Sequence, residues 1–126
     1  MVKVLLLDDQ PLTRSVLKAV LSRLGHQVSA SCGRDGEAVR SFAENPPDLA
    51  ILDIETRGEL GGPGVLRTAR QAGYAGGAIF LSACPKNSVD KKLQGLAFDS
   101  YLEKPIDVTQ LSERIDSVIE KRRLEA

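Results

Sequence analysis

Short apolar runs alternate along the whole chain with segments in which apolar residues recur at helical spacing. Residues 2–7, 50–52 and 78–81 are almost continuously apolar, which is typical of strands buried on both faces of a sheet. Residues 27–32 alternate between polar and apolar types, and residues 100–102 form a short run of polar character. These two segments therefore fit strands at the edges of the sheet.

Five further segments have the spacing of helices. Pro11 suits the first position of the first helix and Gly25 suits its end, whereas Gly95 weakens the fourth helix. Asp107, followed three residues later by Gln110, predicts a capping box at the start of the fifth. The apolar positions are Leu12, Val16, Leu17, Val20, Leu21 and Leu24, then Ala38, Val39, Phe42 and Ala43, then Val65, Leu66 and Ala69, then Val89, Leu93, Leu96 and Ala97, and finally Leu111, Ile115, Val118 and Ile119.

Strands that alternate with helices predict an α/β fold, in which helices cover both faces of a parallel sheet. With the three most apolar strands in the centre, the strand order becomes 2-1-3-4-5, as in flavodoxin-like, doubly wound sheets of five strands with five helices. The length of 126 residues suits a single domain, which we assign to residues 1–126. A ligand site is expected where the order reverses, between the first and third strands.

Composition and charge exclude several classes of function. Seventeen basic residues balance seventeen acidic ones, so no nucleic-acid surface is predicted. No apolar run approaches the ~20 residues of a membrane-spanning helix, and the first residues lack the layout of a signal peptide. We therefore expect a cytoplasmic protein that contacts no membrane. Cys32 and Cys84 fit small apolar residues, with a redox pair as the alternative.

Polar side chains stand where four of the apolar strands end. Asp8 and Asp9 follow the first strand, Asp53 the third, Ser82 the fourth and Lys104 the fifth. The carboxyl ends of parallel strands share one edge of the sheet, so these residues are expected to meet there. Three carboxylates, a hydroxyl and an ammonium group in one crevice suit a divalent cation and a phosphate.

Each of these residues also has an ordinary structural explanation. Asp9 can belong to a capped helix start, Ser82 can be a local cap, and Lys104 can be a solvated residue after a strand. Asp53 argues against the first explanation, because gathered carboxylates repel one another unless a proton or a cation intervenes. Mg²⁺ is the natural cation, since it prefers hard oxygen ligands and keeps several waters. Asp53 is the best nucleophile, because a carboxylate can form an acyl phosphate.

The combined pattern resembles the receiver domain of bacterial two-component response regulators over essentially the whole chain. The matching pieces are Leu7-Asp8-Asp9, residues 47–53, Ser82-Ala83 and residues 99–105. The resemblance implies a role for each of seven site residues. They are Asp53 as phosphoacceptor, Asp8 and Asp9 as the Mg²⁺ pair, the backbone carbonyl of Glu55 as a further metal ligand, Ser82 as switch hydroxyl, Tyr101 as switch aromatic and Lys104 as the phosphate-contacting lysine.

The same resemblance implies that a sensor histidine kinase or phosphotransfer protein is the phosphoryl donor. The chain would then catalyse its own phosphorylation and slow dephosphorylation, and would signal to a partner or output domain through its fourth helix and fifth strand. Nothing after Glu120 has the pattern of an effector domain, so the chain is either a stand-alone receiver or a piece of a longer regulator. Tyr101 could also be an ordinary aromatic residue of an edge strand.

Two other classes of function compete with a receiver. Haloacid-dehalogenase-type phosphatases also use an Asp nucleophile with Mg²⁺, but they usually carry a second Asp two residues later. Here Glu55 follows Asp53 at that spacing, and Gln10 follows Asp8. The third interpretation is an interaction module that works without phosphate.

The chain departs from the family pattern at two places. Thr56 and Arg57 stand where receivers usually have a hydrophobic residue and a proline, and the glycine-rich stretch of residues 55–64 is one residue longer than usual. We therefore expect a looser loop, in which Arg57 could pair with Glu55. Phe98 replaces a generally small residue and is expected to reshape the face formed by the fourth helix and fifth strand.

Overall fold

Five parallel strands form one sheet in the computed structural model, which describes residues 2–125. Their order is β2-β1-β3-β4-β5, so the order predicted from apolar content is confirmed. The strands are β1 (Lys3–Leu7), β2 (Gln27–Cys32), β3 (Leu49–Asp53), β4 (Gly77–Ser82) and β5 (Ser100–Glu103).

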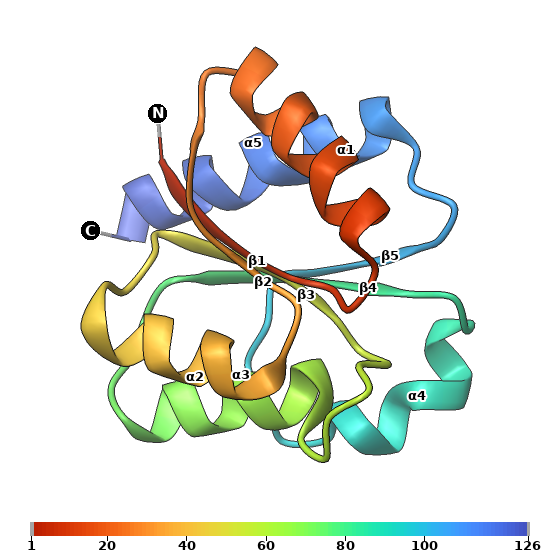
Figure 1. Cartoon of the computed structure of the whole chain (residues 1–126). Helices are drawn as coiled ribbons and strands as arrows, with labels where there is room; N and C mark the ends of the chain where they lie inside the picture. Colours follow the sequence, from red (N-terminus) through yellow and green to blue (C-terminus); the bar gives the residue numbers. More distant parts are fainter. Residues whose placement is uncertain (1, 126) are drawn as a thin grey trace.

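Five helices cover the two faces of this sheet. They are α1 (Pro11–Arg23), α2 (Asp35–Glu44), α3 (Gly61–Gln71), α4 (Lys86–Leu93) and α5 (Val108–Glu125). The helices α1 and α5 lie on one face, and α2, α3 and α4 lie on the other (Figure 1). Among residues 2–125, no helix is both long and apolar enough to cross a membrane.

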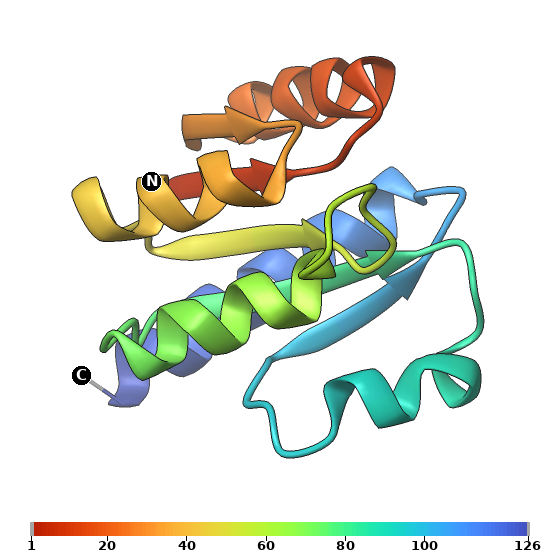
Figure 2. The ribbon, with the colours of Figure 1, turned by 60° about the horizontal axis from the view of Figure 1, so that its bottom comes forward.

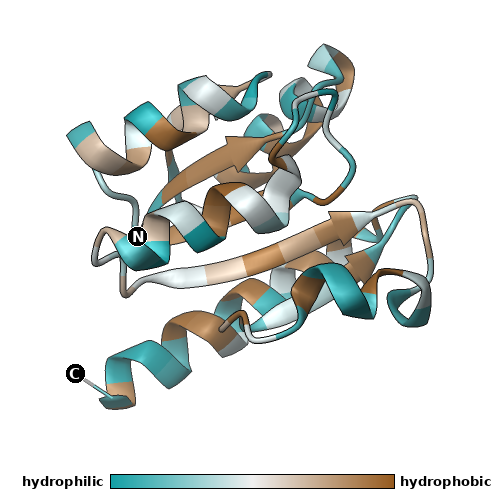
Figure 3. Ribbon diagram, turned by 90° about the horizontal axis from the view of Figure 1, so that it is seen from below, coloured by the Kyte–Doolittle hydropathy of each residue, from teal (hydrophilic) through white to brown (hydrophobic). Residues whose placement is uncertain are grey.

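Each face of the sheet has its own apolar core, because successive side chains of a strand point to opposite faces. In β1, Leu5 and Leu7 pack on the side of α2 and α3, whereas Val4 and Leu6 pack on the side of α1 and α5. Every residue of β3 and β4 is buried. The sheet strands in Figure 3 are mostly hydrophobic, while the hydrophilic colour is concentrated on the helices and loops. The three central strands were therefore predicted correctly.

The helix ends follow local rules. Pro11 is the first residue of α1, and Gly25 follows that helix with φ +86°, a conformation that glycine adopts without strain. The Asp107 carboxylate accepts a hydrogen bond of 3.0 Å from the backbone N–H of Gln110, which confirms Asp107 as the cap of α5. The reciprocal bond to the Gln110 side chain, the other half of the capping box, stays a prediction.

The fourth helix is shorter than its apolar spacing suggested. It ends at Leu93, so the prediction that Leu96 and Ala97 belong to it was wrong. Gly95 has φ +74°, a left-handed conformation that cannot continue a right-handed helix. Only Val89 and Leu93 of α4 are buried.

The register of the sheet aligns the ends of the central strands. Leu7 of β1 lies opposite Leu52 of β3, and Asp53 lies opposite Leu81 of β4. The residues that follow these positions therefore emerge at the same edge of the sheet.

Candidate functional site

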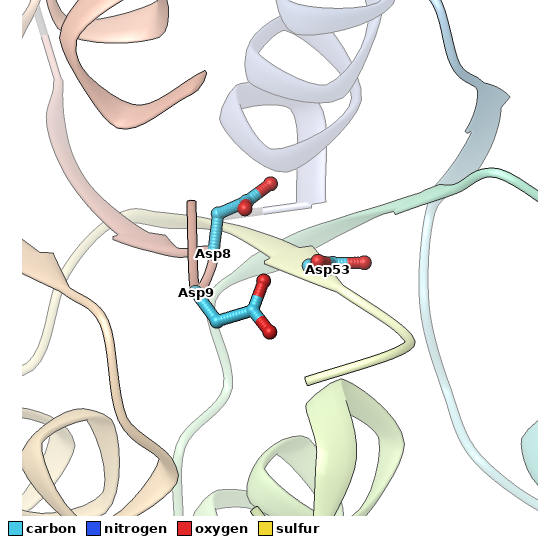
Figure 4. Close-up of side chains that lie close together, drawn as sticks. All are labelled: Asp8, Asp9 and Asp53. Carbon is cyan, nitrogen blue, oxygen red and sulfur yellow. The ribbon is translucent and has the colours of Figure 1, made fainter. Parts of the chain in front are cut away.

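Three carboxylates converge at the carboxyl edge of the sheet. Asp8 and Asp9 follow β1, and Asp53 ends β3 (Figure 4). One ligand oxygen from each residue can be chosen so that all three lie within 4.8 Å of one another. Asp8 and Asp53 are buried, whereas Asp9 is partly exposed. Clustered hard oxygen donors of this kind are what a divalent cation such as Mg²⁺ needs.

Backbone contacts fix two of these carboxylates. One oxygen of Asp8 accepts the N–H of Gln10 at 2.9 Å, and one oxygen of Asp53 accepts the N–H of Glu55 at 3.1 Å. The start of α3 also packs against the end of β3, where a Cβ atom on Gly62 would overlap the carbonyl oxygen of Asp53. Glycine at position 62 therefore allows the close approach that sets the position of Asp53.

Lys104 supplies the positive charge of the site. Its Nζ lies 3.0 Å from Oδ2 of Asp8 and 3.3 Å from Oδ2 of Asp53. The backbone N–H of Lys104 donates to the carbonyl of Ser82 at 2.7 Å, which ties the end of β5 to the end of β4. The ammonium group therefore reaches the two buried carboxylates together.

Burial and charge change the acidity of this site. Burial, assisted by the nearby charge of Asp8, raises the pKa of Asp53 to about 6, although Lys104 acts in the opposite direction. Burial alone would lower the pKa of Lys104, but its hydrogen bond to Asp8 and the charges of Asp53 and Asp8 outweigh that effect and raise it. Lys104 is therefore a cation at neutral pH, and Asp53 is mostly ionised but can take up a proton in mild acid.

Ser82 lies at the same edge, but its hydroxyl contacts Glu55 and not the three carboxylates. Ser82 is fully buried, and its Oγ lies 2.7 Å and 2.9 Å from the two carboxylate oxygens of Glu55. The backbone N–H of Ala83 donates to the same carboxylate at 3.2 Å. The predicted metal role of the Glu55 carbonyl oxygen stays a prediction.

Tyr101 and Phe98 are partly buried and pack against the same apolar core. The Tyr101 hydroxyl donates a hydrogen bond to the carbonyl of Cys84, and its half-buried ring packs against the core under α4. The ring of Phe98 packs edge-to-face on Phe80, with centroids 5.3 Å apart. Cys84 and Cys32 are both free thiols.

Arg57 does not pair with Glu55, so that expectation was wrong. Its Nε lies 3.4 Å from Oδ2 of Asp9 instead. The Glu55 carboxylate accepts hydrogen bonds from Ser82 instead. The Arg57 side chain is 87% exposed, so this ion pair adds little to stability.

Asp35 anchors the loop next to the site, and the sequence analysis did not identify this residue. Its buried carboxylate accepts hydrogen bonds from Oγ1 of Thr56 at 2.7 Å and from the N–H groups of Leu60 and Gly61 at 3.1 and 3.0 Å. These contacts anchor the loop between β3 and α3, which was expected to be loose and which extends beyond the end of β3 in Figure 2. The sequence feature that could have pointed to Asp35 is an acidic residue in the first turn of a helix, in a chain that also has a glycine-rich loop after the next strand.

Together, the doubly wound fold and the acidic cluster at its switch point define a flavodoxin-like α/β domain with a candidate cation site. The model of the response regulator receiver domain matches residues 4–116, and the chain belongs to this family.

Individual proteins that are similar to this chain include response regulators. The chain is 32% identical to the transcriptional regulatory protein PcoR of Escherichia coli over 129 residues, which cover 100% of this chain and 55% of PcoR. It is 30% identical to protein PilH of Pseudomonas aeruginosa, over 94% of this chain and 98% of PilH. The chain spans about half the length of the transcriptional regulators that it matches, and nearly all of PilH.

Solved structures show the same fold. The signal receiver domain of a modulated diguanylate cyclase from Desulfovibrio desulfuricans aligns with a TM-score of 0.89 and 28% identity, over 100% of this chain and 99% of that chain. A CheY-like receiver domain protein from Methanospirillum hungatei aligns with the same TM-score at 20% identity, over 98% of both chains, and this likeness supports the fold alone.

Proposed function

We propose that this chain is a phosphoacceptor receiver domain, comprising residues 1–126, in which Asp53 takes a phosphoryl group from a sensor histidine kinase or phosphotransfer protein. The observation that carries the proposal is the position of Asp53. Its buried carboxylate stands at the end of the central strand β3, 3.3 Å from the Lys104 ammonium and next to the carboxylates of Asp8 and Asp9.

The proposed reaction transfers a phosphoryl group from a histidine nitrogen to a carboxylate oxygen. A carboxylate oxygen of Asp53 attacks the phosphorus of a phosphohistidine, and a P–O bond forms while the P–N bond breaks. The imidazole nitrogen leaves with the electron pair and takes up a proton. Lys104 is placed to neutralise charge on the transferred group, which is most of what phosphoryl transfer requires. Water later hydrolyses the acyl phosphate, so the domain acts as a timed switch more than as a turnover enzyme.

The donor set fits the metal that this chemistry uses. Asp8, Asp9, Asp53 and the backbone carbonyl of Glu55 would hold Mg²⁺, which supplies positive charge to the phosphoryl oxygens when bound. Asp8 and Asp53 also share the Lys104 ammonium, so this chain's own residues neutralise part of the cluster.

Phosphorylation is proposed to act on Ser82 and Tyr101. A phosphoryl oxygen on Asp53 would accept a hydrogen bond from Ser82 and would favour the inward position of Tyr101, which shifts an existing two-state balance. The face formed by α4 and β5 would then present a changed surface to a protein partner or output domain in the cytoplasm.

Labelling by a small phosphodonor tests the proposal. The protein is incubated with acetyl phosphate and Mg²⁺, and its intact mass is measured. We expect the mass of one added phosphoryl group in the wild type and in Asp116→Asn, a matched change at an exposed acid, and no addition in Asp53→Asn or with excess EDTA. A full adduct on Asp53→Asn contradicts the assignment of the acceptor. Sustained release of phosphate from a generic phosphomonoester would instead support a phosphatase.

A further inference from the structure

The carboxylate of Glu55 already occupies hydrogen-bond donors that a phosphoryl oxygen on Asp53 would need. Ser82 Oγ lies 2.7 and 2.9 Å from its two oxygens, and the N–H of Ala83 lies 3.2 Å from one of them. Ser82 is the last residue of β4 and Ala83 follows it, on the side of Asp53 that faces β5. An anion belonging to the protein therefore binds the donors before any phosphate arrives.

These contacts continue without a break to the switch aromatic. The Cys84 N–H donates to Ser82 Oγ at 2.9 Å, and the hydroxyl of Tyr101 donates to the Cys84 carbonyl. A chain of hydrogen bonds thus runs from Glu55 through Ser82 and Cys84 to Tyr101, and so from the end of β3 to β5. It joins Ser82 to the Tyr101 hydroxyl, and these are the two groups on which the proposed function has phosphorylation act.

Ser82 needs this acceptor. Its hydroxyl is fully buried, and its oxygen already accepts the Cys84 N–H, so its own proton requires a partner on the other side. The Glu55 carboxylate is such a partner, because both of its oxygens lie within hydrogen-bond distance of the Ser82 hydroxyl. The Lys104 ammonium does not compete for Glu55, because it contacts Asp8 and Asp53.

We infer that Glu55 is a positioning residue for the switch, whose carboxylate acts as an internal stand-in for the phosphoryl group. It holds Ser82 and Tyr101 inward in the unphosphorylated protein and must release Ser82 when Asp53 is phosphorylated. The first half of this inference concerns the protein without phosphate, and only the second half rests on the proposed function.

The test follows Tyr101 directly. The protein is labelled with 3-fluorotyrosine, and the two fluorine signals are assigned with Tyr74→Phe and Tyr101→Phe. Spectra are recorded with EDTA and without any phosphodonor. We expect Glu55→Ala to shift the Tyr101 signal and to lower the ratio of inward to outward populations roughly tenfold, because a hydrogen bond to a charged group is lost. Glu59→Ala, which removes the same charge from the same loop, should leave the signal in place.

Further variants separate positioning from a general structural effect. Glu55→Gln keeps an oxygen that can accept from Ser82, so it should shift the Tyr101 signal less than Glu55→Ala does. Ser82→Ala should shift it as far as Glu55→Ala, and the double variant should shift it no further. A Tyr101 signal that stays at its wild-type position in both Glu55 variants overturns the inference.

A phosphoryl analogue separates the two proposals. Adding Mg²⁺ and beryllofluoride to Glu55→Ala should return the Tyr101 signal to the inward position, because the analogue on Asp53 replaces the missing anion. If the proposed function fails, beryllofluoride changes no spectrum, yet the shift between wild type and Glu55→Ala remains. If the inference fails, Glu55→Ala causes no shift while beryllofluoride and acetyl phosphate still act on Asp53.

Discussion

Replacing Asp53 by asparagine should make the metal-free protein more stable, and the gain should depend on pH. Asn resembles the protonated carboxyl group in shape but cannot ionise. The change therefore removes the cost of keeping a charged carboxylate at a buried site beside Asp8, while it leaves the packing at the end of β3 unchanged.

The magnitude follows from the acidity of the site. Burial raises the pKa of Asp53 from its ordinary value of 3.8 to about 6, so the unfolded chain loses this proton at lower pH than the folded chain does. The free energy of unfolding therefore falls as the pH rises between about 4 and about 6, and the full penalty of about 3 kcal/mol is present above that range. Well below about pH 4 both states are protonated and no penalty remains.

The assay is urea denaturation with EDTA at about pH 4 and about pH 7.5, for the wild type, Asp53→Asn and Asp116→Asn. We expect Asp53→Asn to gain about 2–3 kcal/mol at the higher pH and less than about 1 kcal/mol at the lower one, and Asp116→Asn to gain little at either. Adding Mg²⁺ should stabilise the wild type more than Asp53→Asn and so narrow the gap. A gain that is equal at both pH values, or a loss at the higher one, would refute this reasoning.

Three further predictions address the other residues of the site. Asp9→Ala should abolish the Mg²⁺-dependent rise in melting temperature but raise metal-free stability by less than about 1 kcal/mol, since Asp9 is partly exposed; a retained metal response would contradict its assignment. Glu55→Asn should speed the decay of phosphorylated Asp53 roughly 3- to 30-fold, about 0.7–2 kcal/mol, because a carboxylate repels a hydroxide-like nucleophile; decay within twofold of wild type would show that Glu55 does not set the lifetime. Asp35→Ala should cost about 2–4 kcal/mol in urea denaturation, because it leaves the N–H groups of Leu60 and Gly61 without their acceptor; a cost under about 1 kcal/mol would show that the loop has other anchors.

Exposed acids next to two of these positions serve as matched controls. Glu37→Ala lies in the same first turn of α2 as Asp35, and Glu59→Asn lies in the same loop as Glu55. In each control, the free energy of unfolding or the activation free energy of decay should stay within about 0.5 kcal/mol of the wild-type value, as is usual for surface substitutions.

Most of the fold could be predicted from the sequence, because the apolar content of each strand reflects its position in the sheet. Strands buried on both faces must be apolar throughout, so β1, β3 and β4 stood out, and the alternating β2 and short β5 could only be edges. The edge at which Asp53 and Lys104 meet then followed from the parallel order. The end of α4 was missed, because spacing alone gave Leu96 more weight than the glycine before it.

Contacts that involve the loops could not be predicted from the sequence pattern. Arg57 was expected beside Glu55 from proximity along the chain, yet the folded loop carries it to Asp9. The contact between Glu55 and Ser82 joins residues 27 positions apart, and no local periodicity encodes it. The hydrogen bonds of Asp35 are also between residues far apart in the chain, because its partners lie in the loop after β3. Such contacts depend on how the chain crosses between elements, which propensity and period do not determine.

The short helix α4 gives the domain a part that can move at low energetic cost. Only Val89 and Leu93 attach it to the core, whereas α3 has five buried residues and α5 has three. Local opening of such a helix needs far less free energy than global unfolding, so its backbone amides should exchange with solvent earlier than those of α3 and α5. A rearrangement that begins at Ser82 can therefore be absorbed by α4 alone, while the central strands, at whose ends the carboxylate cluster lies, remain a rigid frame.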